Sequence, residues 1–182
     1  MQDNRQNVFR EGTLMIIRSE TPDDFTAVRE ILLAAFSPHP MSQQTEHLIV
    51  EGLRADGAMT AALVAEIDGN VVGQIAFSPV KIDGEDCGWL GVGPLAVLPD
   101  FQRQGIGKTL VNEGVRAVRE LGAAGCILVG YPAYYGRFGF ENNAALLMEG
   151  IPPEVVLCLP MSDQKIEGTV TFHPAFQAGM EL

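Results

Sequence analysis

The segment Leu98–Val111, LPDFQRQGIGKTLV, holds residues whose types and spacing could bind phosphate. Gly105 and Gly107 can adopt backbone angles that other residues avoid, and they carry no side chain that would block a ligand. Because a helix is expected to follow, the N–H groups of this segment would point into one concavity at its positive end. The segment therefore predicts a phosphate-binding loop, which could hold a nucleoside triphosphate or the pyrophosphate of another cofactor.

The ending Gly107-Lys108-Thr109 has the form of a nucleoside-triphosphate P-loop, whose full pattern is G-x-x-x-x-G-K-[ST]. Gln102 stands where the first glycine of that pattern should be. The strand CILVG that follows the helix runs into Tyr131 rather than into a carboxylate that could hold magnesium. Nucleotide hydrolysis is therefore not expected, and the chain should show no magnesium-dependent turnover of nucleotide.

A second glycine-rich segment, GVGPLA at 91–96, matches the form G-x-G-x-x-A of a dinucleotide-binding turn. That fingerprint requires a helix to open at the glycines. Pro94 and Pro99 instead bracket an apolar run that is typical of a strand. The match is therefore attributed to chance.

Strand and helix signals place the phosphate loop at a strand-to-helix junction. The run CGWLGVGPLAVL is too long and too rich in glycine for a flat strand, and its centre, Gly91 to Pro94, predicts a bulge or a splay. A helix is expected from Gly105 to about Leu121. Its apolar stripe consists of Ile106, Leu110, Val111, Val115, Val118 and Leu121.

The remaining elements alternate between helix and strand patterns. A short strand from Met15 precedes a helix that Thr21 and Pro22 begin, and a weaker helix follows at 45–53. Two strands flank the turn at 68–70 and form a hairpin. Beyond the phosphate loop, CILVG predicts a buried strand, PAYYGRF a short helix, and the remainder short strands.

This order of elements indicates an α+β fold, a sheet with helices packed on it. Residues 1–14 are polar and are expected to form an N-terminal extension, whereas 15–182 are expected to form a single domain. The chain has 182 residues and is 47% hydrophobic, which suits one domain with a substantial core.

Charge and hydropathy exclude several classes of partner. The formal net charge of −11 argues against a nucleic-acid binder, because nothing offsets the repulsion between the protein and phosphate. No apolar run is long enough to cross a bilayer, so no membrane partner is expected. The N-terminus lacks the apolar region of a signal peptide, and the cytoplasm is the expected location.

Cysteine and histidine usage indicates neither a disulfide framework nor a metal site. The three cysteines lie far apart in apolar surroundings without a CxxC pair, so buried free thiols are expected. The three histidines are scattered, and no metal site is predicted. These residues are Cys87, Cys126, Cys158, His39, His47 and His173.

The segment LAVLPDFQRQGIGKTLV resembles the acyl-CoA-binding motif of the GNAT superfamily of N-acetyltransferases, whose signature is [Q/R]-x-x-G-x-[G/A]. The preceding V-x-P and the strand–helix context match as well. Further along, AYYGRFGF is similar to the family's Y-x-x-x-G-F, with Tyr135, Gly139 and Phe140 at the defining positions. The two motifs have the family's order and separation, and the elements from Met15 to about Leu147 follow the family's sequence of strands and helices. The tail GTVTFHPAF resembles one bacterial branch whose substrates are uncharacterised.

The resemblance implies a GNAT-like α+β fold with a central mixed, mostly antiparallel sheet, splayed between the strands GPLAV and CILVG and flanked by helices. Acetyl-CoA, the implied acyl donor, would insert between those two strands, and no metal is implied. The implied binding residues are Leu95, Ala96, Val97, Gln102, Arg103, Gln104, Gly105, Ile106, Gly107, Lys108 and Thr109. The amide of Val97 is the candidate oxyanion donor.

The implied activity is transfer of an acetyl or other short acyl group to a primary amine, by direct attack in a ternary complex. Tyr135 falls at the position of the family's general acid, and a phenol pKa near 10 suits protonation of a thiolate. The other interpretation of Tyr135 is packing against Tyr134 and Phe138. A different function for the same fold is a non-catalytic acyl-CoA sensor or scaffold.

The sequence leaves the general base and the acceptor open. Glu66, Glu85 and Asp86 lie near the long strand, but each is typical of a solvated carboxylate, and a water chain could serve instead. This chain has Tyr131 where the bacterial branch has an acidic residue, which affects any water relay there.

The acceptor-side segments, 37–57 and the tail after Gly150, contain no substrate signature. The candidate acceptors are therefore a small polyamine, an amino acid, an antibiotic, a peptide N-terminus or a protein lysine. A homodimer is compatible with the family, although no residue specifies an interface.

Overall fold

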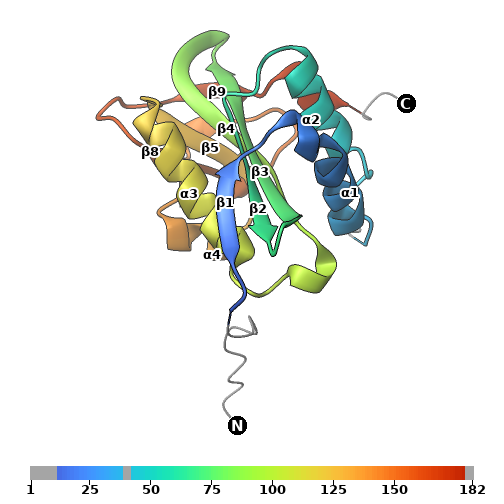
Figure 1. The fold of residues 1–182 in the computed structure, drawn as a ribbon. Coiled ribbons are helices and arrows are strands. Elements are labelled where there is room, and N and C mark those ends of the chain that lie inside the picture. The colour runs from blue at the N-terminus through green and yellow to red at the C-terminus, as the bar shows by residue number, and fades with distance from the viewer. Residues whose placement is uncertain (1–11, 39–41, 179–182) are drawn as a thin grey trace.

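The computed structural model describes residues 12–38 and 42–178. Its sheet has the order β1-β2-β3-β4-β5-β8-β6, in which only the β4–β5 pair is parallel (Figure 1). The strand β9 pairs with β3 and with the short β7. The strands are β1 Met15–Ser19, β2 Ala61–Ile67, β3 Asn70–Ile82, β4 Glu85–Val97, β5 Gly125–Val129, β6 Glu141–Asn142, β7 Leu146–Leu147, β8 Val156–Pro160 and β9 Gly168–Thr171. The predicted α+β class with a mixed, mostly antiparallel sheet is confirmed.

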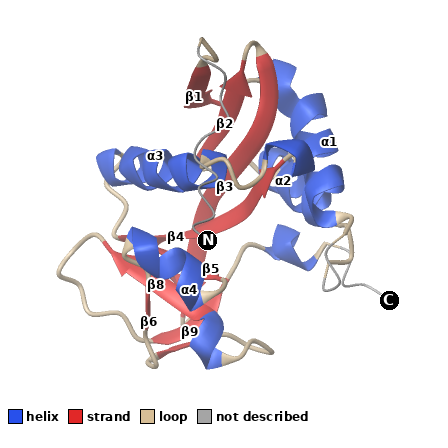
Figure 2. Cartoon of the chain, turned by 90° about the horizontal axis from the view of Figure 1, so that it is seen from below, coloured by secondary structure: helices blue, strands red, loops and turns tan. Residues whose placement is uncertain are grey.

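Helices cover both faces of this sheet (Figure 2). They are α1 Phe25–Phe36, α2 Glu46–Ala55, α3 Ile106–Glu120 and the single turn α4 Pro132–Tyr135. One face is covered by α3, which packs on β2 and β3, and the other by α1 and α2. Two apolar clusters fill the space beneath them, one under α3 and one between α1, α2 and the sheet. None of the helices that the structure describes is long and apolar enough to span a bilayer.

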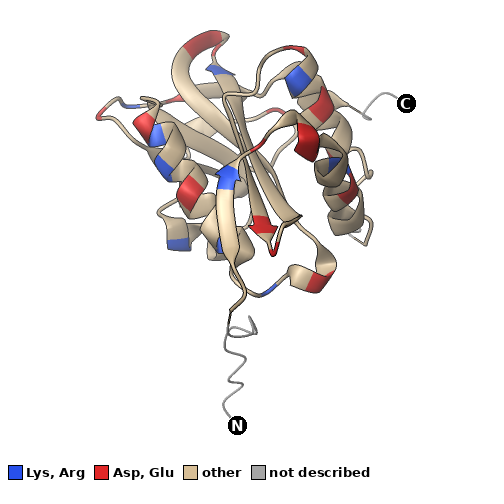
Figure 3. Cartoon of the chain, viewed as in Figure 1, with Lys and Arg blue, Asp and Glu red and all other residues tan. Residues whose placement is uncertain are grey.

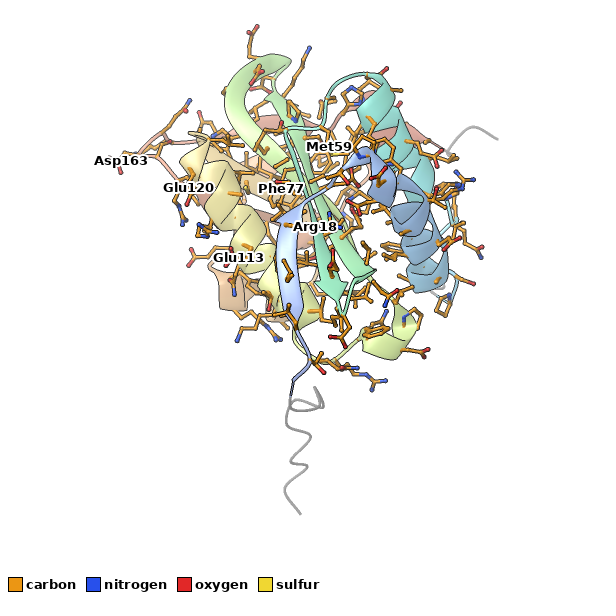
Figure 4. The ribbon with its side chains drawn as sticks, viewed as in Figure 1. Arg18, Met59, Phe77, Glu113, Glu120 and Asp163 are labelled. Carbon is orange, nitrogen blue, oxygen red and sulfur yellow. The ribbon has the colours of Figure 1, made fainter. Side chains whose placement is uncertain are left out.

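The helix α3 lies close to the sheet, and this fixes the position of its N-terminus. Gly114 faces the buried ring of Phe77 at the centre of the sheet (Figure 4). A Cβ added at Gly114 would lie 2.5 Å from Cε2 of Phe77, so no larger residue fits without moving the helix. Five residues of the predicted apolar stripe are buried, but Leu121 is 65% exposed. The prediction for Leu121 was wrong because α3 ends at Glu120 and the chain turns away at Gly122, whose φ is +86°.

The hairpin and the weaker helix that the sequence predicts are both present. The turn at 68–70 joins β2 to β3 as a hairpin, and the weaker helix is α2. Cys126 and Cys158 are buried free thiols, whereas Cys87 is only half-buried because it lies near the exposed end of β4. Most of the expected extension at 1–14 lies outside the described residues.

Charged residues of both signs lie on the same helices (Figure 3). On α3, Arg116 donates hydrogen bonds to both Glu113 and Glu120 on the solvent-facing surface (Figure 4). Such exposed pairs contribute little to stability, because water screens the attraction between their charges. The charges of opposite sign nearly cancel within these helices, so the net charge of −11 comes from residues outside them.

A charged cluster joins β1 to the start of α1. Arg18 of β1 (Figure 4) donates to both carboxylate oxygens of Asp24, with N–O distances of 2.7 and 2.9 Å, and to Glu66 at 2.9 Å. Asp24 also accepts the backbone N–H of Thr21 at 2.8 Å, which caps the turn before α1. These hydrogen bonds, led by the one from Arg18, hold the pKa of the buried Asp24 carboxyl well below its usual range.

We expect Asp24→Asn to lower the free energy of unfolding at pH 7 by on the order of 2 kcal/mol, because hydrogen bonds to charged groups contribute about that much. The folded-state pKa lies below the unfolded value of about 3.9, so the stabilisation is complete above that value and is lost as the pH falls. Urea denaturation should therefore show a smaller difference between variant and wild type at pH 3.5 than at pH 7. Asp23→Asn, at the exposed neighbouring position, is the control; an equal loss in both variants would contradict the role of the cluster.

Candidate active site

The strands β4 and β5 separate as they approach the phosphate loop. They pair only where residues 89–91 face residues 125–127. The last six residues of β4, 92–97, therefore have no strand beside them on the β5 side. Gly93, with a φ of +139°, and a register shift opposite it between Ile75 and Phe77 mark the point of departure. The predicted splay between these two strands is present.

Along the open part of β4, alternate residues direct their backbone groups outward. The N–H of Leu98 donates to the carbonyl of Val72 at 2.8 Å, and Val97 pairs opposite Gly73. Because backbone groups alternate in direction along a strand, those of Val97 and Leu95 point away from β3. The N–H groups of both residues and the C=O of Leu95 are thus available to an extended ligand that lies against this edge as an added strand would.

Ala96 does not take part in this edge. The same alternation turns its backbone groups toward β3, where it pairs with Gln74, and its side chain lies in the cluster under α1 and α2. The predicted contact of Ala96 with the cofactor stays a prediction, although neither the backbone groups nor the side chain of Ala96 faces the gap. The reason is that the register with β3, which the sequence does not reveal, decides which residues of the strand face outward.

The side chain of Gln102 connects the loop to this edge. Its Nε2 donates to the carbonyl oxygen of Val97 at 3.0 Å, and this oxygen lies on the outward side of β4. The interaction occupies the carbonyl of Val97 and leaves the N–H of the same residue facing the gap. Gln102 thus has a positioning role for Val97, in addition to its place in the predicted loop.

The N-terminus of α3 presents unpaired N–H groups beside that edge. Gly105 precedes the helix with a φ of +87°, a conformation that favours glycine, and offers no side-chain cap. Thr109 is the first residue whose N–H bonds back, to the carbonyl of Gly105 at 3.0 Å. The N–H groups of Ile106, Gly107 and Lys108 therefore stay outside the helical ladder, at the positive end of the dipole.

The remaining predicted loop residues divide into two groups. Gln104 and Thr109 use their side chains within the loop, donating to the carbonyls of Asp100 and Gly105 at 3.0 Å each. Arg103 and Lys108 are exposed to solvent and carry the positive charge next to the free N–H groups. Such a combination of amides and cations suits a pyrophosphate.

Tyr134 lies over the first turn of α3, which sequence reasoning did not predict. A Cβ added at Gly107 would stand 3.2 Å from the Tyr134 hydroxyl oxygen. The guanidinium of Arg137 lies 4.8 Å from the centre of the Tyr134 ring. The motif Y-x-x-x-G-F selects Tyr135 as the catalytic residue, and it gives no role to Tyr134. No other sequence signal distinguished the two tyrosines.

Tyr135 lies at the end of α4, where its side chain lines a cavity next to the open edge. Its ring packs edge-on against Tyr134 and Phe140, with centroids 4.9 and 6.0 Å away, and fits against Gly130. Burial raises the pKa of Tyr135 to about 12, so the phenol stays protonated through the neutral range. Tyr135 therefore combines a packed ring with a phenol group beside the cavity.

The cavity has a volume of about 810 Å³ and lies between the splayed strands, α1, α2 and the C-terminal segment. Both acceptor-side segments, 37–57 and the tail after Gly150, contribute to its wall. Much of the wall is apolar and includes Phe36, Ile49, Ile151, Phe172 and Phe176. Tyr131, 70% exposed, stands at its rim, and the Tyr131 carbonyl accepts the N–H groups of Tyr134 and Tyr135.

The three carboxylates that the sequence suggested as bases do not line this cavity. Glu66 is paired with Arg18, and Glu85 and Asp86 are exposed at the far end of β4. The titratable side chains that do line it, besides the tyrosines, are Glu46, Glu149 and His173. Sequence reasoning missed these residues because they come from three distant segments. Among the described residues, no group of three or more His, Cys, Asp or Glu side chains could hold a metal.

Comparison with known proteins places this geometry in a family. Residues 59–142 match the family model described as the acetyltransferase (GNAT) domain. The chain is 42% identical over 131 residues to the uncharacterized N-acetyltransferase YhbS of Escherichia coli K12. The matched region covers 71% of this chain and 75% of that protein.

Two solved structures are similar to this fold over nearly the whole chain. One is a GNAT family acetyltransferase from Brucella melitensis in complex with acetyl-CoA, with 44% identity, a TM-score of 0.81, and coverage of 90% of this chain and 98% of that one. The other is Escherichia coli YhbS in complex with CoA, with 35% identity, a TM-score of 0.83, and coverage of 91% and 93%. The expected fold is confirmed, and the chain belongs to the GNAT family of N-acetyltransferases.

Proposed function

We propose that the protein transfers an acetyl group from acetyl-CoA to a primary amine by direct attack in a ternary complex. The observation that carries the proposal is the continuity of three features: the unpaired N–H groups of α3, the outward edge of β4, and the cavity that Tyr135 lines. The solved relatives hold acetyl-CoA and CoA, respectively, which supports the same ligand here.

The loop and the open edge would hold the donor. The N–H groups of Ile106, Gly107 and Lys108, with the charge of Arg103, bind the pyrophosphate. The N–H of Val97 and the C=O of Leu95 pair with the amide groups of the pantetheine arm. This arrangement directs the thioester toward the cavity, where holding both reactants in line lowers the entropic part of the barrier.

Two groups of the protein then act on the reaction. The amine nitrogen forms a bond to the thioester carbonyl carbon, and the carbon–sulfur bond breaks. We assign donation to the carbonyl oxygen, as it gains charge, to the N–H of Leu95 rather than that of Val97, because Leu95 lines the cavity together with Tyr135. Tyr135 donates a proton to the departing sulfur. Starting from an ammonium ion, the balance is an N-acetylated amine, coenzyme A and one proton released to water.

An acetyl-transfer assay tests this proposal. The protein is incubated with acetyl-CoA and, in turn, with a polyamine, an aralkylamine, an amino acid, an aminoglycoside and a peptide. We expect N-acetyl product in at least one reaction, measured by mass spectrometry, in amounts equal to the coenzyme A released. Binding of acetyl-CoA with no product from any of these acceptors would instead favour the non-catalytic sensor.

We expect Gly130→Ala to lower kcat by about tenfold while leaving the acetyl-CoA Kd unchanged. A Cβ added at Gly130 would lie 2.5 Å from Cε2 of Tyr135, so the ring must shift away from its position beside the cavity; small displacements of catalytic groups cost about this much or more. Gly136→Ala is a matched control, because a Cβ there meets no atom within 4 Å. Equal rates in the two variants would contradict the positioning of Tyr135 by Gly130.

A further inference from the structure

The cavity beside Tyr135 has an unequal distribution of charge. Glu46 and Glu149 line it, and no lysine or arginine is among the described residues of its wall. Glu149 is exposed at the rim, whereas Glu46, in the first turn of α2, is half-buried inside. An anionic acceptor would meet repulsion there, and a cationic one would meet a complementary charge.

The carboxylate of Glu46 is held in place and incompletely paired. The hydroxyl of Ser42 donates to Oε1 of Glu46 at 2.6 Å. The other oxygen, Oε2, is shielded from water and has no hydrogen-bond partner among the residues that the structure describes. A buried carboxylate oxygen without a donor is costly, so a ligand that brings an N–H donor to Glu46 removes that cost. Rotation about the last side-chain bond of glutamate is soft enough to turn this oxygen toward the cavity.

His173 does not offer an equivalent group to a ligand. Its Nδ1 accepts the backbone N–H of Ala175 at 3.1 Å, and its Nε2 faces Asp56 at 3.7 Å. Nδ1 is thus engaged within the C-terminal segment, and Nε2 lies beside the carboxylate that follows α2, although the distance is too long for a hydrogen bond. Of the carboxylates and the imidazole on the wall, Glu46 is the group whose surroundings call for a further donor.

The apolar part of the wall sets the other requirement. Phe36, Ile49 and Ile151 come from three separate segments, and Phe172 and Phe176 stack edge-on with their centroids 4.9 Å apart. A ligand that fills such a surface gains free energy from the burial of its apolar area. Aromatic rings on the wall also favour an aromatic ligand in an edge-on arrangement.

We infer that the acceptor is a primary amine with an apolar, preferably aromatic, body and no carboxylate, and that Glu46 binds its ammonium group. This inference rests on the proposed acetyl transfer and specifies its substrate class. Glu46 binds the amine in its charged form, and the proton that the amine loses passes to water before attack. A free amino acid is excluded by its own carboxylate, which would enter a cavity lined by Glu46 and Glu149.

A set of four small acceptors tests the inference: phenethylamine, phenylalaninamide, phenylalanine and ethylamine. Acetyl transfer is measured as product formed from acetyl-CoA. We expect phenethylamine and phenylalaninamide to be acetylated, phenylalanine to have a kcat/KM at least tenfold below phenylalaninamide, and ethylamine to fall well below phenethylamine. Equal use of phenylalanine and its amide, or no use of phenethylamine by protein that binds acetyl-CoA, would overturn the inference.

The variant Glu46→Gln tests whether Glu46 binds the ammonium group of the acceptor. It keeps an oxygen for the Ser42 hydroxyl and removes the charge, so we expect the KM for phenethylamine to rise at least tenfold with kcat nearly unchanged. Glu51→Gln, on the same helix but paired with Arg29 on the surface, should leave both parameters at wild-type values. An unchanged KM in Glu46→Gln would overturn the role of Glu46. Calorimetry on both variants separates this from the proposed function, which fails if acetyl-CoA does not bind or if no amine of the wider acceptor panel is acetylated.

Discussion

Gly107→Glu is expected to raise the acetyl-CoA Kd by on the order of 100-fold, or about 3 kcal/mol. Gly107 stands in the first turn of α3, with its N–H free and its Cα facing the Tyr134 hydroxyl and the side chain of Val97. A glutamate side chain would place a negative charge where the pyrophosphate is proposed to bind. It would also displace Tyr134 from its position over the helix. Isothermal titration calorimetry with acetyl-CoA measures the loss.

A second variant separates this local effect from a general change in charge. Asn112→Glu adds the same carboxylate to an exposed position on α3, one and a half turns further along. We expect its affinity for acetyl-CoA to stay within about twofold of wild type, since exposed charges this far apart are largely screened. Wild-type affinity in a folded Gly107→Glu variant would show that the loop does not hold the pyrophosphate.

Tyr135→Phe is expected to lower kcat by about 100-fold, the lower end of what a general acid contributes, with the acetyl-CoA Kd nearly unchanged. The substitution keeps the ring that packs against Tyr134, Phe140 and Gly130, so the fold should be retained. Only the phenol group is removed. Steady-state kinetics at saturating acetyl-CoA, together with calorimetry, provides the separation of kcat from binding.

The raised pKa of Tyr135 adds a condition on pH. Because burial raises this pKa to about 12, the phenol is protonated, and can act as the acid, at every pH below about 11. The wild-type kcat should therefore show no loss from ionisation of Tyr135 between pH 7 and 10. The buried sulfur of the donor would have its own pKa raised by the same desolvation, which keeps the two groups comparable.

Tyr134→Phe distinguishes the two tyrosines. The Tyr134 hydroxyl lies over Gly107 rather than on the cavity side, so its loss should affect the KM for acetyl-CoA more than kcat. A rate in Tyr135→Phe equal to that of wild type would remove the general-acid role from Tyr135. An equal loss of kcat in both variants would show that the effect is not specific to the phenol of Tyr135, and would contradict its assignment as the general acid.

Local patterns were sufficient to predict the loop and the helix that carries it. Gly105 and Gly107 mark a strand-to-helix junction by spacing alone, and the stripe from Ile106 to Val118 predicts which face of α3 is buried. These features depend on residues that are close in sequence, and backbone sterics or helical period determines them. The Leu121 error has the same origin, since the period continues past the residue where the helix ends.

The orientation of β4 and the composition of the cavity could not be predicted in this way. Whether Ala96 or Val97 faces outward depends on the register with β3. A single register shift between Ile75 and Phe77 reverses which alternate residues of β4 face outward. Glu46 lies in the first helical turn, where an acidic residue is common for reasons of the helix dipole alone. Only the tertiary structure shows that it shares a cavity with Tyr135 and the C-terminal aromatic residues.

The central claim is that the loop from Gln102 to Thr109 holds the pyrophosphate of coenzyme A. Calorimetric titration of the purified wild-type protein with acetyl-CoA, and separately with ATP and magnesium, tests it most directly. We predict one acetyl-CoA per chain with a Kd in the micromolar range, about −8 kcal/mol, and no heat from ATP. Failure to bind acetyl-CoA, or equally tight binding of ATP and magnesium, would contradict the assignment of the loop.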